Sequence, residues 1–168
     1  TEPGSITSGV IGNPFSGNTF ISGVLGRVPP NYSQEGIMQT VVGFTIEKQY
    51  IIRFHQTVVK QINCIDNSGS WAVYIDTVLA GITIPTISNK PVGSTNLIWE
   101  SRTISFTSSS TSHLIKFLPM DDDTNHLGSL TDTTGALRMG IDSIGLEVLT
   151  SLNEQRQNKF SLFPNPNN

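Results

Sequence analysis

The stretch Gln49-Tyr-Ile-Ile-Arg-Phe-His-Gln-Thr-Val-Val59 decides the fold class, because its side chains alternate between two kinds. In an extended chain, successive side chains point to opposite faces. One face of this stretch then carries Tyr50, Ile52, Phe54 and Val58, and the other carries Ile51, Arg53, His55 and Thr57. An apolar face opposite a more polar one is typical of a β-strand that covers a core on one side.

Similar alternation recurs along the chain between segments rich in Gly, Pro, Asn and Ser. It predicts strands at 37–42, 71–76, 97–107, 112–118 and 136–148, with a short return at 77–84. The first 36 residues are interrupted by Gly and Pro and predict short edge strands and loops. In the last strand the alternation slips near Asp142 and Ser143, which predicts a β-bulge. About eight short strands with regularly spaced turns indicate an all-β sandwich.

Composition excludes several classes of protein. The 168 residues include 10 Lys and Arg against 13 Asp and Glu, and only 14% are charged. A net charge of −3 does not indicate the basic surface with which proteins bind nucleic acid. No run of apolar residues is long enough to span a membrane as a helix. The polar surface must come from about 37 Ser and Thr residues, which suits a secreted protein.

The single cysteine and the chain ends set the expected domain limits. Cys64 alone excludes a disulfide scaffold, and we expect it to be buried or half-buried. The chain starts at Thr1 without a signal peptide, so we expect a processed form or an excised fragment. We expect one domain at 1–148, a linker at 149–159 and a tail at 160–168 that lies outside the domain core, since Pro cannot continue a ladder.

Residues 35–148 resemble the galactose-binding-like jelly rolls found among carbohydrate-binding modules. The similarity lies in the order and core pattern of the strands, and it implies a jelly-roll β-sandwich of about eight antiparallel strands. The matching pieces are Gly36-Ile-Met-Gln-Thr-Val, Gln49-Tyr-Ile-Ile-Arg-Phe, Trp99-Glu-Ser-Arg-Thr-Ile-Ser-Phe-Thr, His113-Leu-Ile-Lys-Phe and Gly140-Ile-Asp-Ser-Ile-Gly-Leu.

The segment Phe160-Ser-Leu-Phe-Pro-Asn-Pro-Asn is similar to the opening of the C-terminal sorting domain of the Bacteroidetes type IX secretion system. That pattern is an aromatic residue followed by Leu, an aromatic residue and Pro-Asn-Pro. The resemblance covers about nine residues, and the remainder of such a domain is absent. It implies a secreted or cell-surface protein that is longer than this chain.

Sugars present apolar C–H faces that pack on aromatic rings, and hydroxyls that polar side chains bind. The candidate carbohydrate-binding residues are Tyr32, Arg53, His55, Trp71, Tyr74, Asp76 and Trp99. If the strands pair in the usual register, Arg53, His55, Tyr74 and Asp76 share one concave face. Two alternatives stay open: both tryptophans pack in the core, and the shared face is only a solvated sheet surface.

Oxygen-bearing side chains point to a possible structural Ca²⁺ ion. The loop 119–135 is acidic, and its Asp121 and Asp123 are ligands of the type that Ca²⁺ prefers. His126 stands where an EF-hand loop needs Gly, so this loop is not an EF-hand. The jelly-roll resemblance implies Asp142 as a further calcium ligand. Alternatively, Asp142 caps backbone N–H groups at the bulge.

No sequence motif indicates catalysis. A pair of carboxylates suited to glycoside hydrolysis stays open, because the distance between carboxylates depends on the tertiary structure. The three histidines lack metal-ligand spacing, and neither a nucleophile elbow nor a phosphate-binding loop is present. The leading interpretation is a non-catalytic carbohydrate-binding module that targets a secreted or surface bacterial protein to polysaccharide. A structural or adhesive spacer is the alternative, and a hydrolase on the same scaffold comes third.

Overall fold

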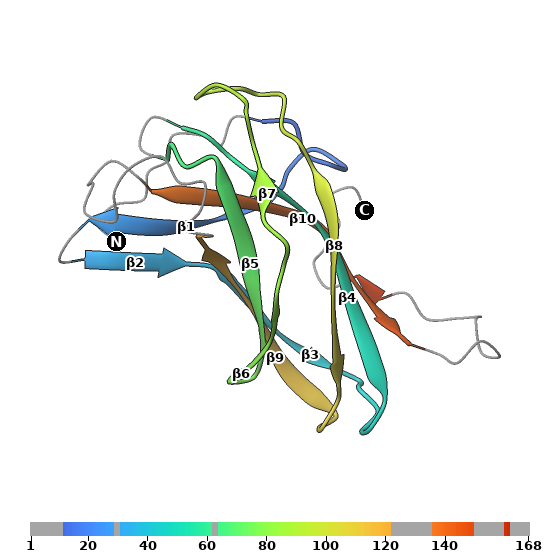
Figure 1. Cartoon of the computed structure of the whole chain (residues 1–168). Helices are drawn as coiled ribbons and strands as arrows, with labels where there is room; N and C mark the ends of the chain where they lie inside the picture. Colours follow the sequence, from blue (N-terminus) through green and yellow to red (C-terminus); the bar gives the residue numbers. More distant parts are fainter. Residues whose placement is uncertain (1–11, 29–30, 62–63, 122–135, 150–159, 162–168) are drawn as a thin grey trace.

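A computed structural model describes residues 12–28, 31–61, 64–121, 136–149 and 160–161. Within these ranges every regular element is a β-strand, and the strands form two facing antiparallel sheets (Figure 1). Sheet A has the order β2-β1-β10-β4-β8, and β11 also pairs with β10. Sheet B has the order β3-β9-β5-β6, and β7 also pairs with β5. No helix in the described ranges is long and apolar enough to cross a membrane.

The strand bounds follow the alternation of the sequence closely in the middle of the chain. Sheet A contains β1 (Ile21–Val28), β2 (Asn31–Glu35), β4 (Gln49–Val58), β8 (Glu100–Thr107), β10 (Leu137–Val148) and β11 (Phe160–Ser161). Sheet B contains β3 (Ile37–Val42), β5 (Ser68–Ile75), β6 (Val78–Ile82), β7 (Thr86–Ile87) and β9 (Ser112–Met120).

The strand order is that of a jelly roll. Strands β3, β5, β6 and β9 form one sheet, whereas β1, β4, β8 and β10 form the other, so the chain crosses repeatedly between the sheets. Two interleaved Greek keys of this kind define the jelly-roll sandwich. The predicted all-β jelly roll is therefore confirmed, with the short strands β2, β7 and β11 added to its eight main strands.

The prediction of edge strands before residue 36 holds in part. Strand β2 lies at the edge of sheet A as expected, but β1 lies inside this sheet, between β2 and β10. Phe160 and Ser161, at the start of the expected tail, pair with Leu146 and Gly145 of β10. The prolines of the tail come after these two residues, so the N–H group that proline lacks is not needed in this ladder. The remaining tail residues and the expected linker lie outside the described residues.

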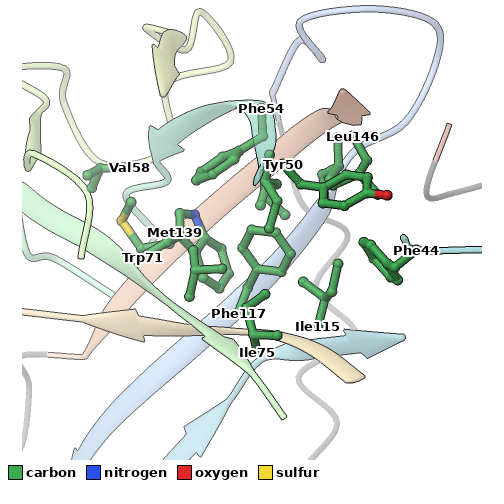
Figure 2. Packing of buried hydrophobic residues seen from close by; sticks show 14 of the residues in the cluster. Phe44, Tyr50, Phe54, Val58, Trp71, Ile75, Ile115, Phe117, Met139 and Leu146 are labelled. Atoms are coloured by element: carbon green, nitrogen blue, oxygen red, sulfur yellow. The ribbon is translucent and has the colours of Figure 1, made fainter. Parts of the chain in front are cut away.

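The core lies between the sheets and is built from the inward positions of β4, β5, β9 and β10 (Figure 2). Phe54, Trp71 and Phe117 are fully or almost fully buried at its centre, and the ring of Phe117 meets the other two rings edge-on. Burying such large aromatic side chains removes the most apolar area from water and dominates the stability of a sandwich. Cys64 is buried and free, as predicted.

One end of the core is closed by a polar network. Gln56, fully buried on the inward face of β4, donates to the carbonyl of Ile84 and to the hydroxyl of Thr86. The hydroxyl of Thr83 donates to the amide oxygen of Gln56 and accepts a hydrogen bond from the backbone N–H of Trp71. Because these buried polar groups satisfy one another, the network fixes the segment 83–86 between the two sheets.

Candidate functional site

The outer side-chain positions of β4, β8 and β10 form a polar surface that we call the β4–β8 face. Opposite pairs in the ladder are His55 with Ser101, Arg53 with Thr103 and Ile51 with Ser105. Strand β10 adds Asp142 beside His55 and Glu147 beside Ile51. The face is defined by Gln49, Ile51, Arg53, His55, Ser101, Thr103, Ser105, Thr107, Asp142 and Glu147.

Hydroxyl groups line the edge of this face. Since side chains alternate along a strand, β8 turns Arg102, Ile104 and Phe106 inward and its hydroxyl residues outward. The outward residues are Ser101, Thr103, Ser105 and Thr107, and all of them are exposed. Sheet A ends at β8, so solvent reaches this row from the face and from the side.

The segment 12–20 covers one end of the face and places an aromatic ring there. Phe15 stacks on His55 with ring centroids 3.4 Å apart and an interplanar angle of 11°. Phe15 is still 48% exposed, so His55 supports the ring while much of it remains open to solvent. Gly17, with a φ of 68°, gives the segment a turn that a residue with a Cβ adopts only under strain.

Three hydrogen bonds hold this segment against the sheet. The N–H of Asn13 donates to the carbonyl of Thr95 at 2.8 Å, and the indole Nε1 of Trp99 donates to the carbonyl of Asn13 at 2.8 Å. The N–H of Ser16 donates to Oδ2 of Asp142 at 3.0 Å. Trp99 also meets the ring of Phe20 edge-on. Trp99 is therefore a positioning residue for the segment that carries Phe15.

Charge on the face is balanced locally. Nε of Arg53 lies 3.0 Å from Oε2 of Glu147, and both side chains are partly exposed. Burial lowers the pKa of His55, and the nearby carboxylate of Asp142 only partly opposes this effect. His55 is therefore neutral at pH 7. Its Nδ1 is buried without a hydrogen-bond partner, which fits a ring whose role here is to stack.

The structure separates the residues that the sequence placed on one shared face. Arg53 and His55 lie on the outer face of sheet A, whereas Tyr74 and Asp76 belong to β5 and the turn after it in sheet B. The prediction of one concave surface with all of these residues is therefore wrong. Strands β4 and β5 are neighbours in the chain, but the jelly roll assigns them to opposite sheets.

The prediction that Trp71 stacks on a sugar is also wrong. Trp71 was a candidate for sugar stacking, but it is completely buried, and its Nε1 donates to the carbonyl of Gly140 at 3.3 Å. Its ring has no face left for a ligand, as the alternative interpretation of core packing predicted. Tyr74 lies on the outer face of sheet B with Nζ of Lys116 4.7 Å from its ring centroid. The side chain of Tyr32 lies outside the described residues, so its role stays a prediction.

The described residues do not fit a calcium site. Oδ1 of Asp142 accepts the N–H of Ser143, and Oδ2 accepts the N–H of Ser16, so both oxygens already bind hydrogen-bond donors. The ladder shifts register between Asp142 and Gly145, which confirms the predicted bulge and the capping role of Asp142. No group of three metal-ligating side chains occurs among the residues that the structure covers. Asp121 directly follows β9, and Asp123 lies outside the described residues.

A Ser–His–Asp arrangement lies at another end of the sandwich, at the β8–β9 turn. Nδ1 of His113 is 2.7 Å from Oδ2 of Asp76, and Nε2 is 3.0 Å from Oγ of Ser108. This order of contacts matches a catalytic triad. However, Ser108 and His113 are each only 2% exposed, and the Ser108 hydroxyl donates its single hydrogen to the carbonyl of Ser110. The cluster thus ties the turn to the sheet and offers no accessible nucleophile.

Asp76 gives this cluster a testable pH dependence. Hydrogen bonds from His113 and from the N–H of Leu114 lower the pKa of Asp76 below its ordinary value. A carboxyl whose folded pKa is depressed stabilises the fold above its unfolded pKa of about 4, and the contribution disappears as pH falls through the folded pKa. In urea unfolding, we expect Asp76→Asn to be less stable than the wild type at pH 7 and the difference to shrink toward pH 2. A difference that is constant with pH would contradict this role of the carboxylate.

Phe15 is the residue that the sequence did not indicate. It lies in Asn13-Pro-Phe-Ser-Gly17, where turn-forming residues surround it and no alternation shows which way its ring points. An aromatic residue within a run of turn formers is the only local signal. Its partner His55 is far along the chain, so the stack follows from the tertiary fold alone.

Comparisons with known proteins found similar solved structures at low sequence identity. No protein-family model matches the chain, and no curated protein matches it. Among solved structures, the C-terminal domain of EclA, described as a sugar-binding protein, is similar with 10% identity and a TM-score of 0.46, covering 88% of this chain and 89% of that chain. The K1 and K3 cleaved adhesin domains of Lys-gingipain from Porphyromonas gingivalis W83 are also similar. K1 has 11% identity and a TM-score of 0.46, over 84% of this chain and 79% of that chain. K3 has 12% identity and a TM-score of 0.44, over 77% of this chain and 74% of that chain.

Proposed function

We propose that this jelly roll is a non-catalytic carbohydrate-binding module of a secreted or cell-surface bacterial protein, and that it binds glycan on the β4–β8 face. The observation that supports this function best is the half-exposed ring of Phe15, stacked on His55 beside a row of exposed hydroxyls. The sorting-domain resemblance at 160–167 supports the proposed location.

The chemistry of the face matches what a sugar presents. A sugar ring packs its C–H face on an aromatic ring and leaves its hydroxyls at the periphery. On the same face as Phe15, the hydroxyls of Ser101 and Thr103, the guanidinium of Arg53 and the carboxylate of Glu147 supply donors and acceptors. Because His55 and Trp99 fix the ring in advance, binding would lose little conformational entropy.

The test is binding of the purified chain to a glycan microarray and to insoluble plant, algal and microbial polysaccharides. For the glycans that bind, we expect Phe15→Ala to raise the Kd by about tenfold, which corresponds to about 1.4 kcal/mol of lost stacking. Isothermal titration calorimetry measures the Kd, and circular dichroism verifies that the variant is folded. Calcium dependence stays a prediction, because Asp123 lies outside the described residues, and a parallel titration in EDTA tests it.

Tyr74→Ala is the matched control, since it removes an aromatic ring from the outer face of the opposite sheet. Its Kd should equal that of the wild type. A loss of binding in Tyr74→Ala but not in Phe15→Ala would move the site to sheet B. Absence of binding to every glycan, with and without Ca²⁺, would refute the function.

A structural or adhesive spacer is the second candidate, and one observation favours it. The outer side of sheet B exposes the apolar side chains of Met38, Val42, Leu79 and Ile82. An apolar face of this kind is typical of a surface that contacts another protein domain. This alternative predicts that the chain binds no glycan and that Phe15→Ala has no effect on the adhesion of the parent protein.

A further inference from the structure

We propose that the β4–β8 face selects an uncharged, extended glycan chain of several sugar units that runs along β8 from Phe15 toward Thr107. This inference rests on the proposed function and names the class of ligand for the same site. It follows from the shape of the hydroxyl row and from the balance of charge on the face.

The row of hydroxyl residues on β8 is long enough to contact several sugar units. Along β8, outward residues follow one another at every second position from Ser101 to Thr107. With a rise of about 3.3 Å per residue, this row is about 20 Å long. Phe15 lies at the Ser101 end, because it stacks on His55, the ladder partner of Ser101. A single sugar on Phe15 would leave most of the row without contact, whereas an oligosaccharide would meet all of it.

The charged groups of the face favour an uncharged ligand. The guanidinium of Arg53 is neutralised by Glu147 at 3.0 Å, and burial keeps His55 neutral at pH 7. Asp142 adds a negative charge, so the described residues of the face include no cation without a carboxylate beside it. A uronic acid or sulfated sugar would meet two carboxylates and no free positive charge, which disfavours its binding.

The first experiment compares ligands on the wild-type chain by isothermal titration calorimetry. The neutral probes are gluco-, xylo-, manno- and galacto-oligosaccharides, each from the monosaccharide to the hexasaccharide. The acidic probes are polygalacturonate, alginate and hyaluronan. We expect the best neutral hexasaccharide to bind at least about tenfold more tightly than its monosaccharide. We also expect the acidic polymers to bind more weakly than the best neutral hexasaccharide.

The second experiment blocks the far end of the row. Ser105→Glu places a charge beside Ile51, away from Phe15, and Thr40→Glu places the same charge on exposed β3 of sheet B. We expect Ser105→Glu to weaken binding of the hexasaccharide by about fivefold or more and to leave the disaccharide unchanged. Thr40→Glu should change neither affinity.

The outcomes separate this inference from the proposed function. Equal affinity for monosaccharide and hexasaccharide, tighter binding of an acidic polymer, or an unaffected Ser105→Glu variant would each overturn the inference. In all of these cases the chain still binds glycan, so the proposed function stands. No binding of any probe would overturn both.

Discussion

Replacing Trp71 with Ala is expected to lower the free energy of unfolding by about 3–5 kcal/mol, the range for a fully buried large aromatic side chain. Its ring packs against Phe117 of the neighbouring strand β9, and its Nε1 donates to the carbonyl of Gly140 in the opposite sheet. The fit is tight, since a Cβ added at Gly23 would lie 2.8 Å from the Trp71 ring. Neighbouring side chains therefore cannot readily fill the cavity that Trp71→Ala leaves, and we expect the whole predicted loss in the free energy of unfolding.

Urea unfolding followed by circular dichroism measures this loss. Ile84→Ala is the control, because Ile84 is 76% exposed and its truncation should change stability by less than about 0.5 kcal/mol. The stability of Trp71→Phe should lie between the stabilities of Trp71→Ala and Ile84→Ala, since this variant keeps a ring but removes the hydrogen bond to Gly140. A Trp71→Ala variant as stable as the control would mean that Trp71 does not lie in the core.

Replacing His113 with Ala is expected to cost about 2–4 kcal/mol, from the cavity and from lost hydrogen bonds together. The imidazole is buried with Phe44 and Phe106 edge-on against it, and it bridges Ser108 and Asp76. Its removal leaves the buried Ser108 hydroxyl without one of its partners. Exposed Asp76 can regain water, so the larger part of the loss should arise at the turn.

Two variants separate packing from hydrogen bonding at this site. His113→Phe retains a ring without nitrogen atoms and should recover part of the stability, whereas Ser109→Ala on the exposed turn should be neutral. Turnover of p-nitrophenyl acetate tests the catalytic alternative. We expect none above background, and an activity that disappears in Ser108→Ala would show that the cluster is a nucleophile after all.

Local patterns predicted most of the fold, with clear exceptions. Alternation placed β4, β9 and β10 well, and the slip near Asp142 indicated the bulge that the ladder contains. The central position of β1 was missed, because Gly and Pro before residue 36 obscure alternation. Alternation predicts a strand only from Trp71 onward, yet β5 begins at Ser68, and the side chains of Ser68 and Ser70 are both buried.

The residues of the candidate site were likewise predicted only in part. Arg53, His55 and Asp142 meet on the β4–β8 face, and Trp99 anchors the segment that covers it. Tyr74 lies in sheet B, Asp76 lies in the turn that follows it, and Trp71 lies in the core. A period of two shows which residues of one strand share a face, but it does not show which sheet that face belongs to.

The sequence by itself determined the class of the fold, the orientation of side chains within each strand and the low charge of the surface. These properties are local, since each depends on a few neighbouring residues and on the geometry of an extended chain. Only the tertiary structure decided that the ring of Phe15 stacks on His55 and that Ser108 and Asp76 both contact His113. It also decided that β4 and β5 lie in opposite sheets. Such contacts join distant segments, and their geometry is set by how the two sheets pack around one core.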